Sequence, residues 1–192
     1  MPVTTRVPLA KRPRDLAYFF FFLIHIPTTL LVDAQPLYPS WAPSFLSSLP
    51  KYYVDMSNDP LLGSALGFYG EARRQTYNWF RWFLIMEVFF QLPVFVLALR
   101  GLWRGTTSIY LLLLIYGAST ATTTLACIAD VVATPVTPTP TRTPVVTITP
   151  EQQLLLLSSY IPFFLVPFII AIDMAFRLHK LVTVKAANVK TD

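Results

Sequence analysis

Three polar residues recur at one-turn intervals in the first apolar stretch of the chain. His25, Thr29 and Asp33 follow one another at i, i+4 and i+8 within a sequence that is otherwise almost entirely apolar. At 3.6 residues per turn, positions with this spacing share one side of a helix. An imidazole, a hydroxyl and a carboxylate on one face can transfer protons, bind a cation or hydrogen-bond to a neighbouring helix. The spacing therefore predicts a polar stripe on an apolar helix.

A second pair of polar residues lies in the second apolar stretch. Glu87 is followed one turn later by Gln91, and insertion scales assign about 2.5–3.5 kcal/mol to a charged side chain at the centre of a membrane helix. Glu87 can avoid much of this cost by binding a proton, and the neutral acid can then donate a hydrogen bond to an ionised carboxylate such as Asp33. Two carboxyls that share protons suit a hydrophobic amine. The alternative is that Glu87 and Gln91 only hydrogen-bond helices to each other.

Small hydroxyl side chains follow one side of the third apolar stretch. Tyr116, Thr120, Thr123 and Cys127 recur there at helical spacing. Tyr116 and Thr123 are candidates for lining a cavity, and the alternative is that the threonines serve close helix packing, as they commonly do in membranes. Cys127 is the only cysteine, which excludes an intramolecular disulfide and a cysteine-based metal cluster. We expect no metal and no cofactor.

The composition shows which elements must position these residues. Of the 192 residues, 54% are hydrophobic and 13% are charged, and the mean hydropathy is +0.54, which excludes an ordinary soluble domain. Four stretches approach the roughly 20 residues that a bilayer core demands, namely about 16–32, 79–99, 108–133 and 154–176. We therefore predict an all-α, polytopic membrane protein whose four transmembrane helices form a bundle in the lipid bilayer.

Basic residues are distributed unevenly between the two sides of this bundle. Ten of the fifteen lie in the N-terminal arm, in the link between the second and third spans, or in the C-terminal tail. The positive-inside rule therefore predicts a cytosolic arm at 1–15, a membrane domain at 16–180 and a cytosolic tail at 181–192. The net charge of +5 follows from this asymmetry and needs no nucleic-acid partner. Asp173 and Arg177, one turn apart near the cytosolic end of the last span, predict an interfacial ion pair.

Two longer loops remain on the other side. The first, about 33–78, is rich in aromatic residues and proline, and we expect it to form a packed cap over the mouth of the bundle. The second, 134–150, reads TPVTPTPTRTPVVTITP and contains five prolines and seven threonines. Because proline prevents regular pairing and there are few apolar side chains to bury, we expect an extended, solvated spacer. O-glycosylation of this loop stays open as an alternative.

Four blocks of the sequence resemble the sigma-2 receptor family of EXPERA-domain proteins. In chain order they are HIPTTLLVDAQ in the first span, NDPLL at 58–62, MEVFFQLP at 86–93 and YIPFFLVPFI at 160–169. The resemblance implies a four-helix protein of the endoplasmic reticulum membrane whose cavity binds sterols and cationic amphiphiles, with a part in cholesterol handling. In fungi the family includes an efficient mitochondria targeting-associated protein, so organellar protein delivery is a second implied role.

The resemblance also implies a set of ligand-binding residues. Asp33 matches the aspartate that pairs with the amine of the ligand, and Glu87 matches the partly buried acid beside it. Asp59 matches an aspartate of the cap that orders the site. Further cavity-lining positions of the family are matched by Gln91, Thr123 and Tyr160.

The main alternative to a binding protein is an enzyme. The sterol isomerases of the same superfamily protonate a sterol and shelter the resulting cation with acidic groups and a tryptophan, and His25 would be a candidate for such proton transfer. All four tryptophans of this chain precede the third span, and only four spans are visible where the isomerases resemble five-helix proteins. We therefore expect binding without catalysis, with His25 orienting Asp33 or bonding across helices. A scaffold or chaperone for a membrane-protein partner stays open, as does a homodimer.

Overall fold

The computed structural model describes residues 7–39, 41 and 43–189, and four long apolar helices dominate it. The helices that are long and apolar enough to cross a membrane cover Pro13–Asp33, Asn78–Arg104, Thr107–Ala133 and Pro150–Val184. Helices satisfy every backbone hydrogen bond internally, which a segment in lipid requires. The prediction of an all-α membrane protein with four spans is confirmed.

Each of the first two spans contains one π-helical turn. α1 (Pro13–Thr28) continues into the π turn Thr29–Asp33. α5 (Asn78–Met86) continues through the π turn Glu87–Gln91 into α6 (Leu92–Arg104). Such wider turns are rare and frequently lie at functional sites. Here they contain three of the predicted site residues, Asp33, Glu87 and Gln91.

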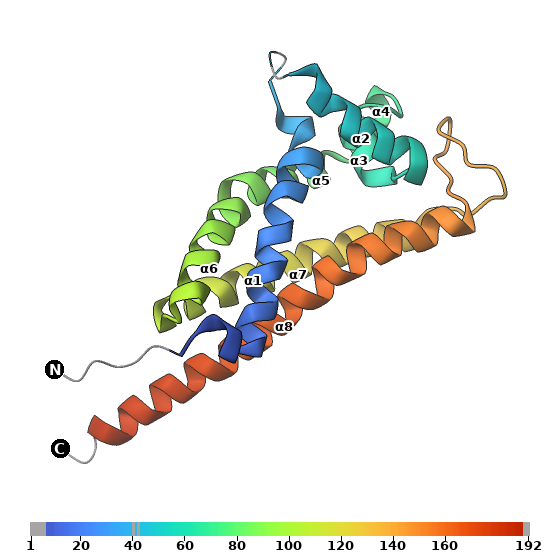
Figure 1. The fold of residues 1–192 in the computed structure, drawn as a ribbon. Helices are drawn as coiled ribbons and strands as arrows, with labels where there is room; N and C mark the ends of the chain where they lie inside the picture. The colour runs from blue at the N-terminus through green and yellow to red at the C-terminus, as the bar shows by residue number, and fades with distance from the viewer. Residues whose placement is uncertain (1–6, 40, 42, 190–192) are drawn as a thin grey trace.

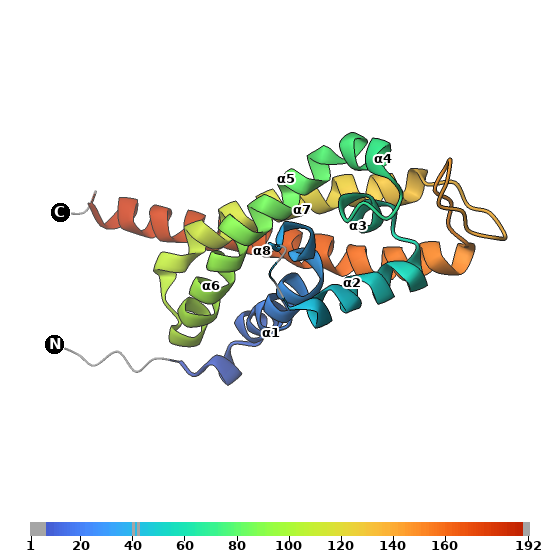
Figure 2. The ribbon, with the colours of Figure 1, turned by 90° about the horizontal axis from the view of Figure 1, so that it is seen from above.

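The last two spans are antiparallel and lie side by side in both views (Figure 1, Figure 2). They are α7 (Tyr110–Ala133) and α8 (Pro150–Val189), and α8 continues through its two internal prolines. A β-carbon added to Gly117 of α7 would lie 2.5 Å from the carbonyl oxygen of Pro167 in α8. The two backbones therefore meet directly, as small residues allow in membrane helix pairs.

A dense aromatic core fills the bundle at the end nearer the chain termini. The rings of Phe22, Phe95 and Tyr116 are fully buried and contact one another at centroid distances of 5.2–5.6 Å. Contacts of this kind add to the stabilisation that burial of apolar surface provides. This end of the bundle is thus closely packed.

Three short helices follow the first span and precede the second in the sequence, and they lie at the end of the bundle opposite the N-terminus (Figure 1). They are α2 (Ser44–Ser57), α3 (Pro60–Ala65) and α4 (Glu71–Thr76). Buried side chains from α2, from α3 and from the loop before α4 form a small core there, made of Val54, Leu62 and Tyr69 together with Val146. These helices form the cap that the sequence predicts. Single 3-10 turns lie at Leu9–Lys11, Gln35–Leu37 and Thr107–Ile109.

The prediction of a solvated spacer at residues 134–150 is correct only in part, because residues 138–145 are exposed but the end of the loop is buried. Val146 and Ile148 are buried, at 1% and 0% exposure, and Ile148 pairs with Val136 in an isolated parallel bridge. Residues two apart in an extended segment point to the same side, so Val146 and Ile148 share one buried face, whereas Val136 and Val145 are 44% and 51% exposed. The overall composition did not reveal this, because burial depends on where the apolar residues stand rather than on their number.

Polar contacts hold the same loop against the cap. Asn58, the C-cap of α2, has a left-handed φ of 50°, which asparagine tolerates better than most residues. Its Nδ2 donates to the carbonyl oxygens of Thr141 and Thr147 at 3.1 and 2.8 Å. Arg142 donates to Asn58 Oδ1 at 2.9 Å and forms an ion pair with Asp55 at 2.8 Å. The loop is therefore an ordered part of the cap end of the molecule.

Candidate functional site

A cavity of about 410 Å³ lies between the four spans and the cap. It falls within the size range of sites for small organic ligands. Seven of the eight predicted site residues line it, namely His25, Asp33, Asp59, Glu87, Gln91, Thr123 and Tyr160. Phe80, Phe83 and Leu84 of α5, together with Phe163, supply apolar walls. Among the lining residues that the structure describes, there is no lysine and no arginine, so the cavity has an excess of acidic groups.

The carboxylate of Asp59 is fully occupied by donors. As the N-cap of α3, its Oδ1 accepts the backbone N–H groups of Leu61 and Leu62 at 2.8 and 3.0 Å. Its Oδ2 accepts the hydroxyls of Tyr53 and Tyr160 at 3.2 and 2.9 Å. Burial raises the pKa of Asp59, and these four hydrogen bonds act in the opposite direction. Asp59 thereby joins the cap to α8.

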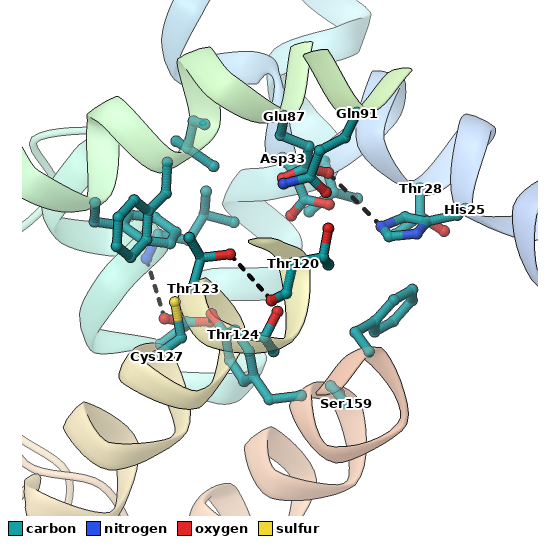
Figure 3. Close-up of a pocket in the computed structure, with 18 of the residues that line it drawn as sticks. His25, Thr28, Asp33, Glu87, Gln91, Thr120, Thr123, Thr124, Cys127 and Ser159 are labelled. Atoms are coloured by element: carbon teal, nitrogen blue, oxygen red, sulfur yellow. Dashed lines mark hydrogen bonds and ion pairs between the residues drawn. The ribbon is translucent and has the colours of Figure 1, made fainter. Parts of the chain in front are cut away.

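Glu87 faces the polar stripe of the first span. The hydroxyl of Thr29 donates to Glu87 Oε1 at 2.6 Å, and His25 Nε2 lies 3.7 Å from the same oxygen (Figure 3). The imidazole is enclosed by aromatic rings, with centroids 4.6 Å from Phe95 and 4.5 Å from Phe163. Two residues of the predicted polar stripe, His25 and Thr29, therefore contact Glu87 of the second span.

Asp33 differs from the other two acids because none of the described residues donates to its carboxylate. It lines the cavity but makes no hydrogen bond or ion pair within the part of the chain that the structure describes. The predicted hydrogen bond from a protonated Glu87 to Asp33 is not present among these contacts, and the hydrogen bond that Glu87 does make is with the Thr29 hydroxyl. Figure 3 shows Asp33 close to Glu87 and Gln91, on the same side of the cavity.

The hydroxyl stripe of α7 is divided between the cavity and the core. Thr120, Thr123 and Thr124 line the cavity, and the Thr123 hydroxyl donates to backbone carbonyls of its own helix, at 3.1 Å to that of Thr120. Tyr116 is not among the lining residues that the structure describes, because it is fully buried in the aromatic core. Helical spacing identifies the face on which a residue lies but not its depth in the bundle, so Tyr116 and Thr123 looked equivalent in the sequence.

Several lining residues escaped the sequence argument. Tyr53 is one of many aromatic residues in the predicted cap, and Ser158 and Ser159 directly precede the YIPFF block; none of the three is assigned to the site from the sequence. All three line the cavity. Tyr53 reaches Asp59 from only six positions away, yet its direction depends on the fold of the cap. The serines had a usable signal, because they precede a residue, Tyr160, already assigned to the site.

Comparison with known proteins gives consistent results along the chain. Residues 45–174 match the family described as EXPERA, the expanded EBP superfamily. The chain is 32% identical over 170 residues to sigma intracellular receptor 2 of Xenopus tropicalis, which covers 88% of this chain and 91% of that protein. The human protein of the same name is 30% identical over 169 residues, with 87% and 90% covered. Efficient mitochondria targeting-associated protein 19 of Schizosaccharomyces pombe is 28% identical over 181 residues, with 91% and 82% covered.

Proposed function

The chain belongs to the EXPERA family of multi-pass membrane proteins, and we propose that its intramembrane cavity binds a sterol or a hydrophobic amine without catalysing a reaction. The observation that carries this proposal is the state of Asp33. This carboxylate faces a cavity without a described lysine or arginine, and none of the described residues donates to it. A carboxylate in apolar surroundings without a partner is costly. A ligand cation beside Asp33 would remove that cost.

The remaining walls define the rest of the ligand. Phe80, Phe83 and Phe163 line the cavity together with leucines, so most of the ligand must be apolar. Polar groups also line the cavity, and the threonines of α7 and the serines of α8 among them offer hydrogen bonds to a hydroxyl group. An amphiphile with one cationic amine, or a sterol with one hydroxyl, has this distribution of polarity.

Three observations support binding without catalysis. The relatives are named as receptors and targeting-associated proteins. No tryptophan is among the described residues that line the cavity, whereas the sterol isomerases of the superfamily shelter their cation with one. The Nε2 atom of His25 faces Glu87, and the ring is enclosed by phenylalanines. We therefore expect a purified sample to leave a sterol with a movable double bond unchanged, as measured by mass spectrometry or chromatography.

We further propose that the protein resides in the endoplasmic reticulum membrane with both termini in the cytosol. The start of α1 and the end of α8 lie at the same end of the bundle (Figure 1), where the basic residues also gather. The relatives suggest sterol homeostasis or organellar protein delivery as the cellular role, because two of them are named as an intracellular receptor and one as a mitochondria targeting-associated protein. A membrane-protein partner would suit the second role.

The test is to compare a tertiary amine and a sterol on the wild type and on Asp33→Asn. The substitution keeps the shape of the side chain and removes its charge, so we expect amine affinity to fall by about 2–5 kcal/mol, the range for truncating one partner of a buried charge pair. Sterol affinity should change far less. Asp55→Asn, which makes the same change at a half-exposed aspartate paired with Arg142 outside the cavity, is the matched control. A folded Asp33→Asn protein that binds the amine as well as wild type would show that the proposed site is wrong.

A further inference from the structure

Arg81 is an arginine within a membrane span, and it has no partner among the described residues. It lies one turn into the span that begins at Asn78, and its side chain makes no hydrogen bond or ion pair with any residue that the structure describes. Its Nε atom is buried and unbonded. A cation at this depth is unfavourable unless it reaches the membrane surface or meets an anion. Because no described residue supplies an anion, a negatively charged group from outside the chain would stabilise Arg81.

Arg81 lines a second cavity, which shares no lining residue with the first. This cavity has a volume of about 160 Å³ and is otherwise lined by Glu71, Arg74, Gln75 and Asn78. The volume corresponds to about five water molecules at their share of the liquid, roughly 30 Å³ each, and a phosphate group has five heavy atoms. All five lining residues are polar, which an apolar ligand would not favour.

Arg74 gives this cavity a second cation. Its Nε is also buried and unbonded. Its ion pair with Glu71 is long, at 3.5 Å, and the glutamate side chain is 65% exposed, so this contact contributes little. Two guanidinium groups against one exposed carboxylate leave the cavity with a positive charge.

The other charged groups nearby are already engaged with one another. Arg73 donates to the hydroxyl of Tyr77 at 3.0 Å and to Ser64 at 3.4 Å. The same Tyr77 hydroxyl lies 3.2 Å from a carboxylate oxygen of Asp130 in α7. Arg73 and Asp130 thus both bond to the Tyr77 hydroxyl, and their opposite charges offset each other. Neither is among the residues that line the second cavity.

We propose that Arg74 and Arg81 bind the phosphate of a phospholipid headgroup. Guanidinium groups pair with phosphate oxygens in a bidentate manner, and the side-chain amides of Gln75 and Asn78 offer further donors. The site bridges α4, which precedes the span, and the first turn of α5, which begins it, so it lies at the depth of the headgroups. Figure 2 shows α4 leading into α5 at the margin of the bundle.

The outer surface of the same span favours a lipid over a free phosphate ion. Trp82 and Phe89, seven residues apart on the membrane-spanning helix, are 63% and 76% exposed. Residues with this spacing lie on one side of a helix, and tryptophan is favoured at the level of lipid headgroups. The acyl chains of a lipid bound at Arg81 would extend along this surface, whereas a free phosphate ion would gain nothing from it.

Native mass spectrometry of the full chain can test this proposal with phosphatidylglycerol and with monoolein, which has no phosphate. We expect wild type to retain phosphatidylglycerol in preference to monoolein. Arg81→Gln should weaken phosphatidylglycerol binding about tenfold, the effect of losing one hydrogen bond to a charged group. The affinity of Arg81→Lys for phosphatidylglycerol should lie between those of wild type and Arg81→Gln, because lysine keeps the charge and loses the planar fork. Arg104→Gln makes the same charge change at an exposed arginine at the other end of the second span and should leave binding within about twofold.

Three outcomes would overturn the proposal. Equal losses in Arg81→Gln and Arg104→Gln would show general attraction between basic residues and anionic lipid. Equal retention of monoolein and phosphatidylglycerol by wild type would show that phosphate is not recognised. Saturable binding of inorganic phosphate that Arg81→Gln abolishes, with phosphatidylglycerol binding unchanged, would assign the cavity to a free ion. Thermal unfolding checks each variant, and Arg74→Gln, with the same expected direction, replaces Arg81→Gln if that variant does not fold.

Discussion

The first span has an aspartate near each end, and the two aspartates differ in their partners. Near the N-terminus, Asp15 is buried and forms ion pairs with Arg12 and with Arg177, the latter at 2.7 Å. At the other end, Asp33 faces a cavity and has no cationic partner within the part of the chain that the structure describes. The same side chain, in the same span, is neutralised by arginines at one end and has no described partner at the other.

The paired end also shows what such neutralisation does for the fold. Asp173 accepts from Arg177 at 2.6 Å and from Arg14 at 3.1 Å, which joins α8 to α1. Arg12 extends the connection to α6, where it donates to the carbonyl oxygen of Leu102 at 2.6 Å. Acids that have guanidinium partners here hold helices together. We infer from these two ends that a membrane-protein acid without a donor indicates a binding site, whereas an acid engaged by donors indicates a structural role.

The largest effect that this comparison predicts is on stability, at Asp15. Asp15→Asn would leave two guanidinium groups beside a neutral side chain, and breaking a buried ion pair from one side costs about 3–5 kcal/mol. We expect the lower end of that range, because Arg177 keeps Asp173 and Arg12 keeps the Leu102 carbonyl. Chemical denaturation in detergent micelles measures the change in unfolding free energy.

The matched control for Asp15→Asn is Asp33→Asn, the same substitution at the other end of the same span. Because Asp33 has no described partner to lose and its unpaired charge is costly, its replacement should leave the unfolding free energy unchanged or raise it. A loss at Asp33 as large as that at Asp15 would mean that Asp33 is structural after all. The distinction between the two ends would then fail.

The sequence anticipated the acids of the cavity better than it anticipated their partners. Helical spacing placed His25, Thr29 and Asp33 on one face, and the structure directs the first two at Glu87. The ion pair of Asp173 with Arg177 also followed from spacing alone. Both are local relations, set by the geometry of one helix.

Relations between distant elements could not be read in the same way. The π turns at Thr29–Asp33 and Glu87–Gln91 shift the register of both helices, and no spacing rule identifies them beforehand. The contact of Asp15 with Arg177 joins residues 162 positions apart. The burial of Val146 and Ile148 depends on a cap built from a separate segment. These features arise from packing, which one sequence does not display.

Asp59 sharpens the comparison because it lies in the cavity but has partners. Asp59→Ala would remove the cap of α3 and leave the hydroxyls of Tyr53 and Tyr160 without their acceptor. We expect a loss of about 2 kcal/mol in unfolding free energy, from the cap and from the unsatisfied donors. The effect is smaller than at Asp15, because the donors are neutral. Asp59→Asn, which keeps one acceptor oxygen, should lose less.

The same variants show whether Asp59 is a structural acid or an acid that pairs with the ligand. If Asp59 is a structural acid, amine affinity should follow the loss of stability and recover in Asp59→Asn. A stable Asp59→Ala protein whose amine affinity falls as far as that of Asp33→Asn would contradict this assignment. Asp59 would then be a second acid that pairs with the ligand, and the presence of donors would not separate structural acids from binding acids.

The smallest effect is expected at Glu87, which stands between the two classes. It has one donor, the Thr29 hydroxyl at 2.6 Å, and no arginine or lysine among its described contacts. In Glu87→Gln the amide oxygen can still accept from Thr29, so amine affinity should fall by less than about 1 kcal/mol, the usual scale of a neutral hydrogen bond. Thr29→Val removes the donor and leaves the acid. Titration of the amine against this variant and against Glu87→Gln distinguishes a protonated Glu87 from an ionised one. If Glu87 is protonated in the complex, both changes are small. If it is ionised, Glu87→Gln should cost the amine as much affinity as Asp33→Asn does, and the cavity would then present two anions to its ligand rather than one.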